Sequence, residues 1–191
     1  ETMRSDFASA FYHANKCLAL AEDCGSASVY QSALGNLGNI CYHRGAFDEA
    51  TQFLTQAIAT PQRSDVWVGC ADTLARVSLA QDRLDDCASW LDKIDESPAK
   101  PDGQYAHRYA ELTRAQLLAR QGRLDDAIRQ VHRVSTLAVD SGDQYLASHA
   151  RLIEAELLQE AGRLEECARI LSDVKDAFPS QSPDFVARYE R

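Results

Sequence analysis

Apolar residues recur at helical spacing along almost the whole chain. Between residues 5 and 24 they fall three or four positions apart, on one face of a helix: Phe7, Ala10, Phe11, Ala14, Cys17, Leu18 and Ala21. Gly25 follows, where such a helix would end. Alternation of apolar and polar residues, which indicates strands, is not persuasive in any segment. The pattern therefore predicts an all-α protein.

The remaining helical segments come in pairs joined by short connections, as in antiparallel helical hairpins. The expected pairs are about 28–44 with 48–60, 65–81 with 85–95, 104–121 with 125–140, and 144–161 with 165–178. Residues 96–103 contain two prolines and a glycine and are expected to form a loop or hinge. We expect residues 5–24 to be the second half of a repeat whose first half lies outside this sequence.

One short motif occupies the connection within each pair: a turn-forming residue, an apolar residue, an acid and a small residue. Its four copies are Gly45-Ala-Phe-Asp-Glu-Ala50, Asp82-Arg-Leu-Asp-Asp-Cys87, Gly122-Arg-Leu-Asp-Asp-Ala127 and Gly162-Arg-Leu-Glu-Glu-Cys167. A hairpin that recurs about every forty residues stacks on the preceding one and forms an α-solenoid. We expect a single solenoid over residues 1–191, with four hairpins and flanking half-repeats.

The residue types of the motif predict the structure of the turn. Glycine adopts the left-handed conformation without steric cost, and aspartate at position 82 tolerates it better than most residues. The acids are expected to cap the second helix of each hairpin: Asp48, Asp85, Asp125 and Glu165. The bulky residues are expected to fill space against the neighbouring helix: Phe47, Leu84, Leu124 and Leu164. The small residues are expected to mark close helix contact: Ala50, Cys87, Ala127 and Cys167.

Charge and composition narrow the classes of function. The 191 residues carry a net charge of −9, which argues against a chain that coats nucleic acid phosphates or anionic lipid. No apolar run approaches the roughly 18 residues of a membrane span, and no signal segment opens the chain. A cytoplasmic location follows as the expectation. The six cysteines are dispersed without a C-x-x-C pair, so we expect them to be reduced and structural.

Catalytic and metal-binding patterns are absent from the sequence. The five histidines have no ligand spacing, and neither a G-x-S-x-G elbow nor a phosphate-binding loop is present. Acidic pairs such as Asp85-Asp86 recur at helix starts, where negative charge is favourable. We therefore expect no enzyme activity, no metal site and no cofactor.

Residues 36–50, from Asn36 through the Gly45 turn to Ala50, resemble a tetratricopeptide repeat (TPR), together with Phe53, Leu54, Ala57 and Ile58. The resemblance extends through the turns of the other hairpins. It implies a right-handed superhelix of stacked antiparallel hairpins. The repeat interval here exceeds the usual 34 residues. In this respect the chain is similar to the extended arrays of large bacterial transcription regulators and related signalling proteins.

The resemblance implies that the first helix of each hairpin lines a concave groove. Matching the first helices to the TPR pattern predicts a set of residues that face this groove. They are Ser32, Gly35, Asn39, Tyr42, His43, Asp72, Arg76, Leu79, Tyr109, Leu112, Gln116, Arg120, Leu152, Glu156 and Gln159. The selected partner-binding residues are Asn39, Tyr42, His43, Arg76, Tyr109, Gln116, Arg120 and Glu156. A chaperone-tail clamp is not expected, because Gly35, Tyr109 and Thr113 stand where the clamp needs cations.

The resulting hypothesis is a non-catalytic protein–protein interaction scaffold: the TPR regulatory segment of a larger bacterial transcription or signalling regulator. Its partner is a protein, a peptide or its own effector domains, with no contact to nucleic acid or membrane. One alternative is a sensing domain whose groove binds a peptide or small ligand and controls an attached effector. Another is oligomerisation through the end helices. Glu1 is not an initiator, and Ser182-Pro-Asp184 resembles a helix start, so we expect an excised segment.

Two sets of residues, four charged ones and the two tryptophans, are each open to more than one interpretation. Glu111 and Arg114 are followed one repeat later by Arg151 and Glu154 with the signs reversed, which indicates either a network between first helices or separate solvated charges. We also expect different roles for the two tryptophans. Trp90 lies at helical spacing with Cys87, Leu91 and Ile94 and is expected in the core, whereas Trp67 fits either packing or a partner anchor.

Overall fold

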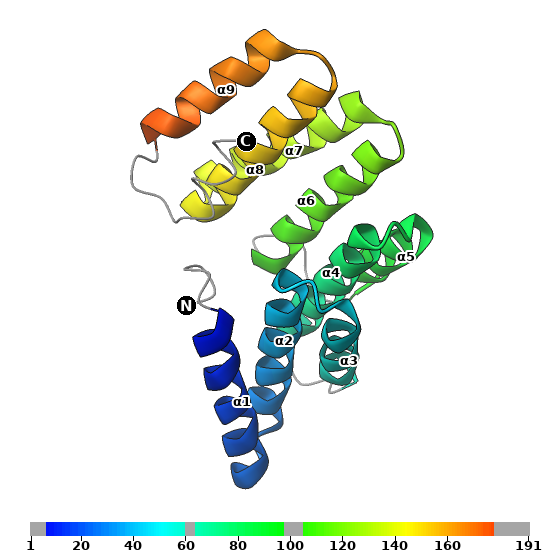
Figure 1. Ribbon diagram of the computed structural model, residues 1–191, viewed down its shortest axis with the longest axis vertical. Helices are drawn as coiled ribbons and strands as arrows, with labels where there is room; N and C mark the ends of the chain where they lie inside the picture. The colour runs from blue at the N-terminus through cyan, green and yellow to red at the C-terminus, as the bar shows by residue number, and fades with distance from the viewer. Residues whose placement is uncertain (1–6, 60–63, 98–104, 178–191) are drawn as a thin grey trace. The chain divides into compact units, whose positions relative to one another are not determined.

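The structure is a computed structural model that describes residues 7–59, 64–97 and 105–177. Within these ranges all regular secondary structure is helical, in nine helices (Figure 1). The bounds are α1 Phe7–Cys24, α2 Ala27–His43, α3 Phe47–Ile58, α4 Ser64–Ala80, α5 Leu84–Asp95, α6 Tyr105–Arg120, α7 Leu124–Asp140, α8 Gln144–Glu160 and α9 Leu164–Ala177. The predicted all-α class is confirmed, and the predicted division of the chain into hairpins stays a prediction. The predicted helix start at Ser182 and most of the predicted loop 96–103 lie outside the described residues.

The helices form two compact units, residues 1–110 and residues 111–191, with the division inside α6. In the first unit α1, α2, α3, α4 and α5 pack in chain order, and α2 also contacts α4 directly. In the second unit α8 packs against both α7 and α9. Each unit is thus built from neighbouring antiparallel helices. That the whole chain forms one continuous array stays a prediction.

The turn between the two helices of each hairpin closes in the same way four times. The residue before the second helix donates its N–H to a carbonyl five positions back: Ala46 to Cys41, Arg83 to Ser78, Arg123 to Leu118 and Arg163 to Leu158, at 2.8–2.9 Å. The residue just before it has positive φ: 75° at Gly45, 61° at Asp82, 78° at Gly122 and 73° at Gly162. This geometry satisfies the last carbonyls of the first helix. The predicted left-handed positions, including the one at Asp82, are confirmed.

The prediction that the acids of the motif cap the second helix is wrong. The N-cap residues of α3, α5 and α7 are Ala46, Arg83 and Arg123, and none of their side chains accepts a capping hydrogen bond. Only one residue separates the left-handed position from the helix, so the acids fall inside its first turn: Asp48, Asp85, Asp125 and Glu165. There they interact favourably with the positive end of the helix without capping it.

The arginines before the second helices pair with acids three positions later. The nitrogen–oxygen distances are 3.2 Å for Arg83–Asp86, 2.7 Å for Arg123–Asp126 and 2.7 Å for Arg163–Glu166. Hydrogen bonds from Arg123 and Arg163 hold the pKa of Asp126 and of Glu166 below the ordinary values. Because these side chains remain partly accessible to water, each pair adds little to the stability of the fold.

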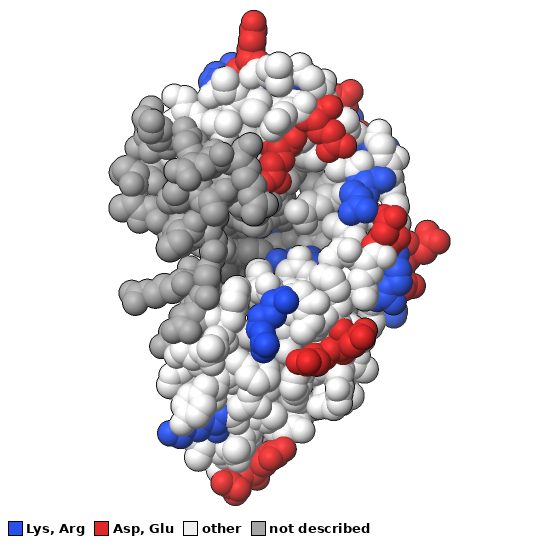
Figure 2. Space-filling view, in the orientation of Figure 1, with Lys and Arg blue, Asp and Glu red and all other residues white. Residues whose placement is uncertain are grey.

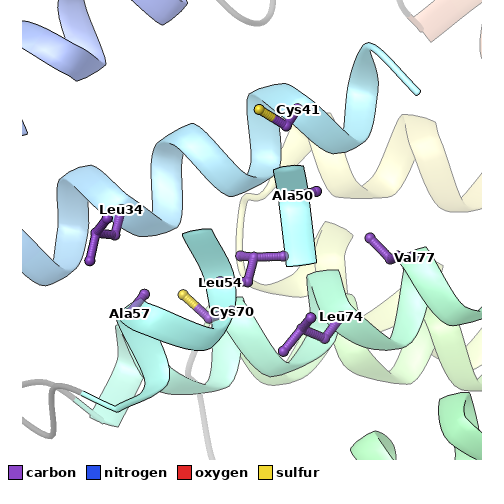
Figure 3. Packing of buried hydrophobic residues seen from close by; sticks show 8 residues of the cluster. All are labelled: Leu34, Cys41, Ala50, Leu54, Ala57, Cys70, Leu74 and Val77. Atoms are coloured by element: carbon purple, nitrogen blue, oxygen red, sulfur yellow. The ribbon is translucent and has the colours of Figure 1, made fainter. Parts of the chain in front are cut away.

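Small buried residues allow the helices of the first unit to approach closely. A core cluster joins α2, α3 and α4, with Leu54 and Cys70 pointing into the space between these helices (Figure 3). Its members are Leu34, Cys41, Ala50, Leu54, Ala57, Cys70, Leu74 and Val77. Burial raises the pKa of the Cys70 thiol to about 12, so this cysteine is a packing residue. A second cluster, Ala14, Leu37 and Ile40, joins α1 to α2.

The motif residues expected at helix contacts behave as predicted with one exception. The small residues Ala50, Cys87, Ala127 and Cys167 are all buried. Among the bulky residues, Phe47 packs on the core cluster, and Leu84 and Leu124 are half-buried. Leu164 is 64% exposed, which contradicts its predicted filling role. The described residues contain no helix after α9 that could cover it.

Two helical glycines give a matched test of the packing. A Cβ at Gly38 would lie 2.4 Å from Cγ of the buried Leu54, whereas a Cβ at Gly69 would meet nothing within 4 Å. Gly69→Ala should raise the free energy of unfolding by about 0.5–1 kcal/mol, because alanine favours the helix. Gly38→Ala should lower it by about 1–2 kcal/mol, because overpacking outweighs the same helix preference. Urea unfolding followed by circular dichroism measures both; equal stabilisation would contradict the close contact of α2 with α3.

The turn at Asp82 gives a second test. Asp82→Gly should raise the free energy of unfolding by up to about 1 kcal/mol, since glycine adopts positive φ without Cβ strain. The reciprocal change Gly122→Asp should lower it by a similar amount, about 1 kcal/mol. Thermal unfolding of both variants, monitored by circular dichroism, checks the opposite signs. Shifts of the same sign would show that backbone strain at these turns does not govern stability.

Candidate functional site

The candidate site lies on the first unit, where α2 and α4 contact each other. These are the first helices of the first two hairpins. Four of the predicted partner-binding residues belong to them: Asn39, Tyr42 and His43 on α2 and Arg76 on α4. We call the surface formed by these four residues the inner face. None of its side chains belongs to the buried core clusters of the unit, although Tyr42 packs against one of them.

Arg76 and Tyr42 form the centre of the inner face. The guanidinium carbon of Arg76 lies 4.4 Å from the centroid of the Tyr42 ring, a cation–π contact between α4 and α2. Both side chains are half-buried. Among the described residues, Arg76 has no carboxylate partner, so its N–H donors are not used in an ion pair within this part of the chain. The site therefore presents an oriented cation with available donors.

Aromatic contacts hold Tyr42 in place. Its ring centroid lies 6.2 Å from that of Phe47 on α3 and 5.1 Å from that of His43. The His43 ring in turn stacks on Phe7 of α1 at 6.2 Å. Such contacts limit the rotamers of the Tyr42 ring before a partner arrives. The half-buried Asn39 lies one helical turn before His43 and adds an amide to the same surface.

The remaining predicted partner-binding residues lie on other helices. Tyr109, in the first unit, is a half-buried residue of α6. In the second unit, Gln116 of α6 is half-buried, whereas Arg120 of α6 and Glu156 of α8 are exposed. Their exposure is compatible with binding but does not by itself identify a binding surface. Their role in partner binding stays a prediction.

Several residues nominated as groove-facing are buried instead. Asp72, Leu112 and Leu152 are 4%, 3% and 3% exposed, and Leu79 is buried as well. A Cβ at Gly35 would lie 3.0 Å from the sulfur of Cys70, so this position faces α4. These positions are turned toward neighbouring helices and are covered by packing. The apolar character of three of them was a sequence signal against their exposure.

Three of the four charges considered for a network between first helices have partners on second helices instead: Glu111, Arg151 and Glu154. Glu111 pairs with Arg114 at 3.8 Å and accepts a hydrogen bond from Gln130 of α7. Arg151 pairs with Asp173 of α9 at 3.4 Å. Glu154 is buried, and its Oε1 lies 3.1 Å from Nδ1 of His132 on α7. Sequence spacing did not indicate Gln130, His132 or Asp173 as partners, because these pairs are about twenty residues apart in the chain.

Other classes of site have no counterpart in the described part of the chain. There, no group of three or more histidine, cysteine, aspartate or glutamate side chains is placed to hold a metal ion. No helix in the described ranges is long and apolar enough to cross a bilayer. On the face shown in Figure 2, basic and acidic side chains are interspersed, and the described residues in view form no continuous basic area.

The contact between Arg76 and Tyr42 can be measured by a double-mutant cycle. We expect a coupling free energy of about 0.5–1 kcal/mol between Tyr42→Leu and Arg76→Met, the range of partly exposed cation–π pairs. Urea unfolding of the two single variants and the double variant provides the value. Strictly additive effects would mean that the ring does not position the guanidinium.

Comparisons with known proteins agree with the fold of repeated helical hairpins. Sequence models described as tetratricopeptide repeat match residues 33–65 and residues 69–93, 109–133 and 148–172. No curated protein matches the chain.

Two similar solved structures show the nearly identical TPR-like repeats of a protein described as a putative kinesin light chain from Podosopora anserina. One of them, a form with a single substitution, has a TM-score of 0.58 and 15% identity, covering 90% of this chain and 86% of that one. The other has a TM-score of 0.55 and 15% identity, covering 90% and 87%. At this identity the likeness concerns the fold. With repeated hairpins, left-handed turns and matched repeats over more than half of its length, the chain belongs to the tetratricopeptide repeat family.

Proposed function

We propose that the inner face of the first unit binds an acidic segment of a partner protein or peptide. TPR repeats generally mediate protein–protein interaction and typically form non-catalytic scaffolds. The proposal assigns that general property to Asn39, Tyr42, His43 and Arg76. The observation that carries it is the half-buried Arg76 guanidinium, held over the Tyr42 ring.

The chemistry of Arg76 supports a carboxylate as the partner group. A guanidinium presents several N–H donors in a plane and binds carboxylates through two parallel hydrogen bonds. Because the Tyr42 ring already orients it, binding immobilises fewer side-chain torsions than for a free arginine. Tyrosine and arginine are also the residue types that contribute most to binding at interfaces.

The wider biological role is part of the same proposal. The long repeat interval resembles that of arrays in bacterial transcription and signalling regulators, which supports a regulatory segment within a larger cytoplasmic protein. In such a protein, the bound segment belongs to another protein or to an attached effector domain. Tyr109, Gln116, Arg120 and Glu156 are further proposed partner-binding residues on α6 and α8, each considered within its own unit.

The proposal is tested by selecting peptides from a random display library on the full chain and measuring the dissociation constants of labelled peptides by fluorescence polarisation. We expect the selected peptides to contain acidic residues. Arg76→Ala should raise the dissociation constant about thirtyfold, equivalent to about 2 kcal/mol for a central interface residue. Tyr42→Ala should weaken binding in the same direction.

The matched control is Arg169→Ala, which removes the same charge from an exposed position on α9 of the second unit. This variant should bind the selected peptides within about twofold of the unmodified chain. If Arg169→Ala and Arg76→Ala weaken binding equally, only net charge matters and the proposed site is wrong. Selection of peptides without acidic residues would contradict the proposed chemistry.

A further inference from the structure

A second surface of the first unit has the composition of a binding site. It is a partly enclosed furrow of about 320 Å³ between α3 and α5, with α4 as its floor. We call it the outer furrow. Its lining residues are Thr51 and Thr55 of α3, Leu74, Val77 and Ser78 of α4, Arg83 of the turn, and Asp86, Ser89, Trp90 and Lys93 of α5.

The outer furrow and the inner face lie on different sides of α4. Leu74, Val77 and Ser78 share one side of the helix, because residues three and four positions apart fall on the same face. At roughly 100° per residue, Arg76 points away from the middle of that group. A ligand in the outer furrow therefore does not occupy the site proposed around Arg76.

Trp90 and Lys93 form one wall of the outer furrow. Trp90 was predicted in the core, but it is half-buried: it packs on the core cluster and also lines the furrow. The Nζ atom of Lys93 lies 4.0 Å from the centroid of the Trp90 ring. In the described part of the chain, Lys93 has this ring contact and no ion pair. An exposed ammonium held over an aromatic ring is thus available to an anion.

The lining of the outer furrow has one more cation than carboxylates, and among the described residues the cation without an ion pair is Lys93. Arg83 and Lys93 contribute two cations, and Asp86, which pairs with Arg83 at 3.2 Å, contributes one carboxylate. The chain carries a net charge of −9. Local positive charge on an acidic protein favours an anionic partner and orients it at this position.

The shape of the outer furrow favours a polypeptide over a small metabolite. The furrow is only partly enclosed, whereas metabolite pockets enclose most of the ligand surface. A second open depression, lined by Asp48, Thr51, Gln81 and Arg83, shares Thr51 and Arg83 with it. The hydroxyl groups of Thr55 and Ser89 stand on opposite walls and can hydrogen-bond a peptide backbone.

We propose that the outer furrow binds an extended acidic segment of a partner protein, with a carboxylate at Lys93 and the neighbouring chain against Trp90. This site is independent of the inner face. A nucleic acid strand and a second copy of this chain are the competing occupants, and both are outcomes of the test below.

The experiment uses the full chain with Trp67→Phe, so that Trp90 is the single tryptophan, and an end-blocked hexaglutamate peptide as the probe. Hexaglutamate should change the Trp90 emission saturably, and the affinity should fall as sodium chloride is added. Hexalysine should give no saturable change. If Trp67→Phe impairs folding, binding to the unmodified chain is measured instead, by the fluorescence anisotropy of labelled hexaglutamate.

Charge reversal locates the site. Lys93→Glu should raise the dissociation constant for hexaglutamate about tenfold, whereas Lys16→Glu, the same reversal at an exposed position of α1, should change it less than about twofold. Arg76→Ala should leave hexaglutamate binding to the Trp90 site intact, which separates this inference from the proposed function.

Three results would overturn the inference. Equal effects of Lys93→Glu and Lys16→Glu would show a response to net charge alone. A concentration-dependent dimer that Lys93→Glu abolishes, seen by light scattering, would make a second copy the occupant. Tighter binding of single-stranded oligothymidylate than of hexaglutamate, also lost in Lys93→Glu, would make nucleic acid the ligand.

Discussion

The left-handed residue at the end of each first helix is the constraint on which the rest of the structure depends. It directs the chain back so that the second helix runs antiparallel to the first, and a hydrogen bond across the turn fixes the angle. In the first hairpin, Gly45 also donates its N–H to the carbonyl of Tyr42 at 2.9 Å. The turn therefore fixes the end of α2 that carries Tyr42 and His43. From this position Tyr42 meets Arg76 of the next hairpin.

Small residues convert that turn geometry into close packing. Ala50 follows the turn and is fully buried, and Gly38 lies against Leu54 with no room for a side chain. This leaves α2 close enough to α3 and α4 for one core cluster to join all three helices. Because the core is formed by these small and aliphatic side chains, the larger polar and aromatic ones remain partly accessible. The sites proposed on the inner face and in the outer furrow consist largely of those residues.

The sequence predicted the local structure well because local structure follows from local chemistry. The period of the apolar residues located the hairpins, and the turn motif located the left-handed positions, including Asp82. Which side chains of a helix are exposed was harder to predict. The position of Asp72 in the repeat did not reveal that its side chain would be buried. Pairs distant in the chain, such as Glu154 with His132, depend on how hairpins pack against each other. Trp90 shows the same limit, since its helical spacing with core residues did not reveal its contact with Lys93.

In the proposed function, a preformed cation on the inner face recognises a partner while the repeat framework stays unchanged. Nuclear magnetic resonance of the isotope-labelled chain, titrated with an acidic peptide selected on it, tests this most directly. We expect large shifts of the Arg76 side-chain Nε–H resonance and of the Tyr42 ring resonances, with the Gly45 and Asp82 amides nearly unchanged. Saturating binding that leaves Arg76 and Tyr42 unperturbed, or that displaces the turn amides, would contradict it.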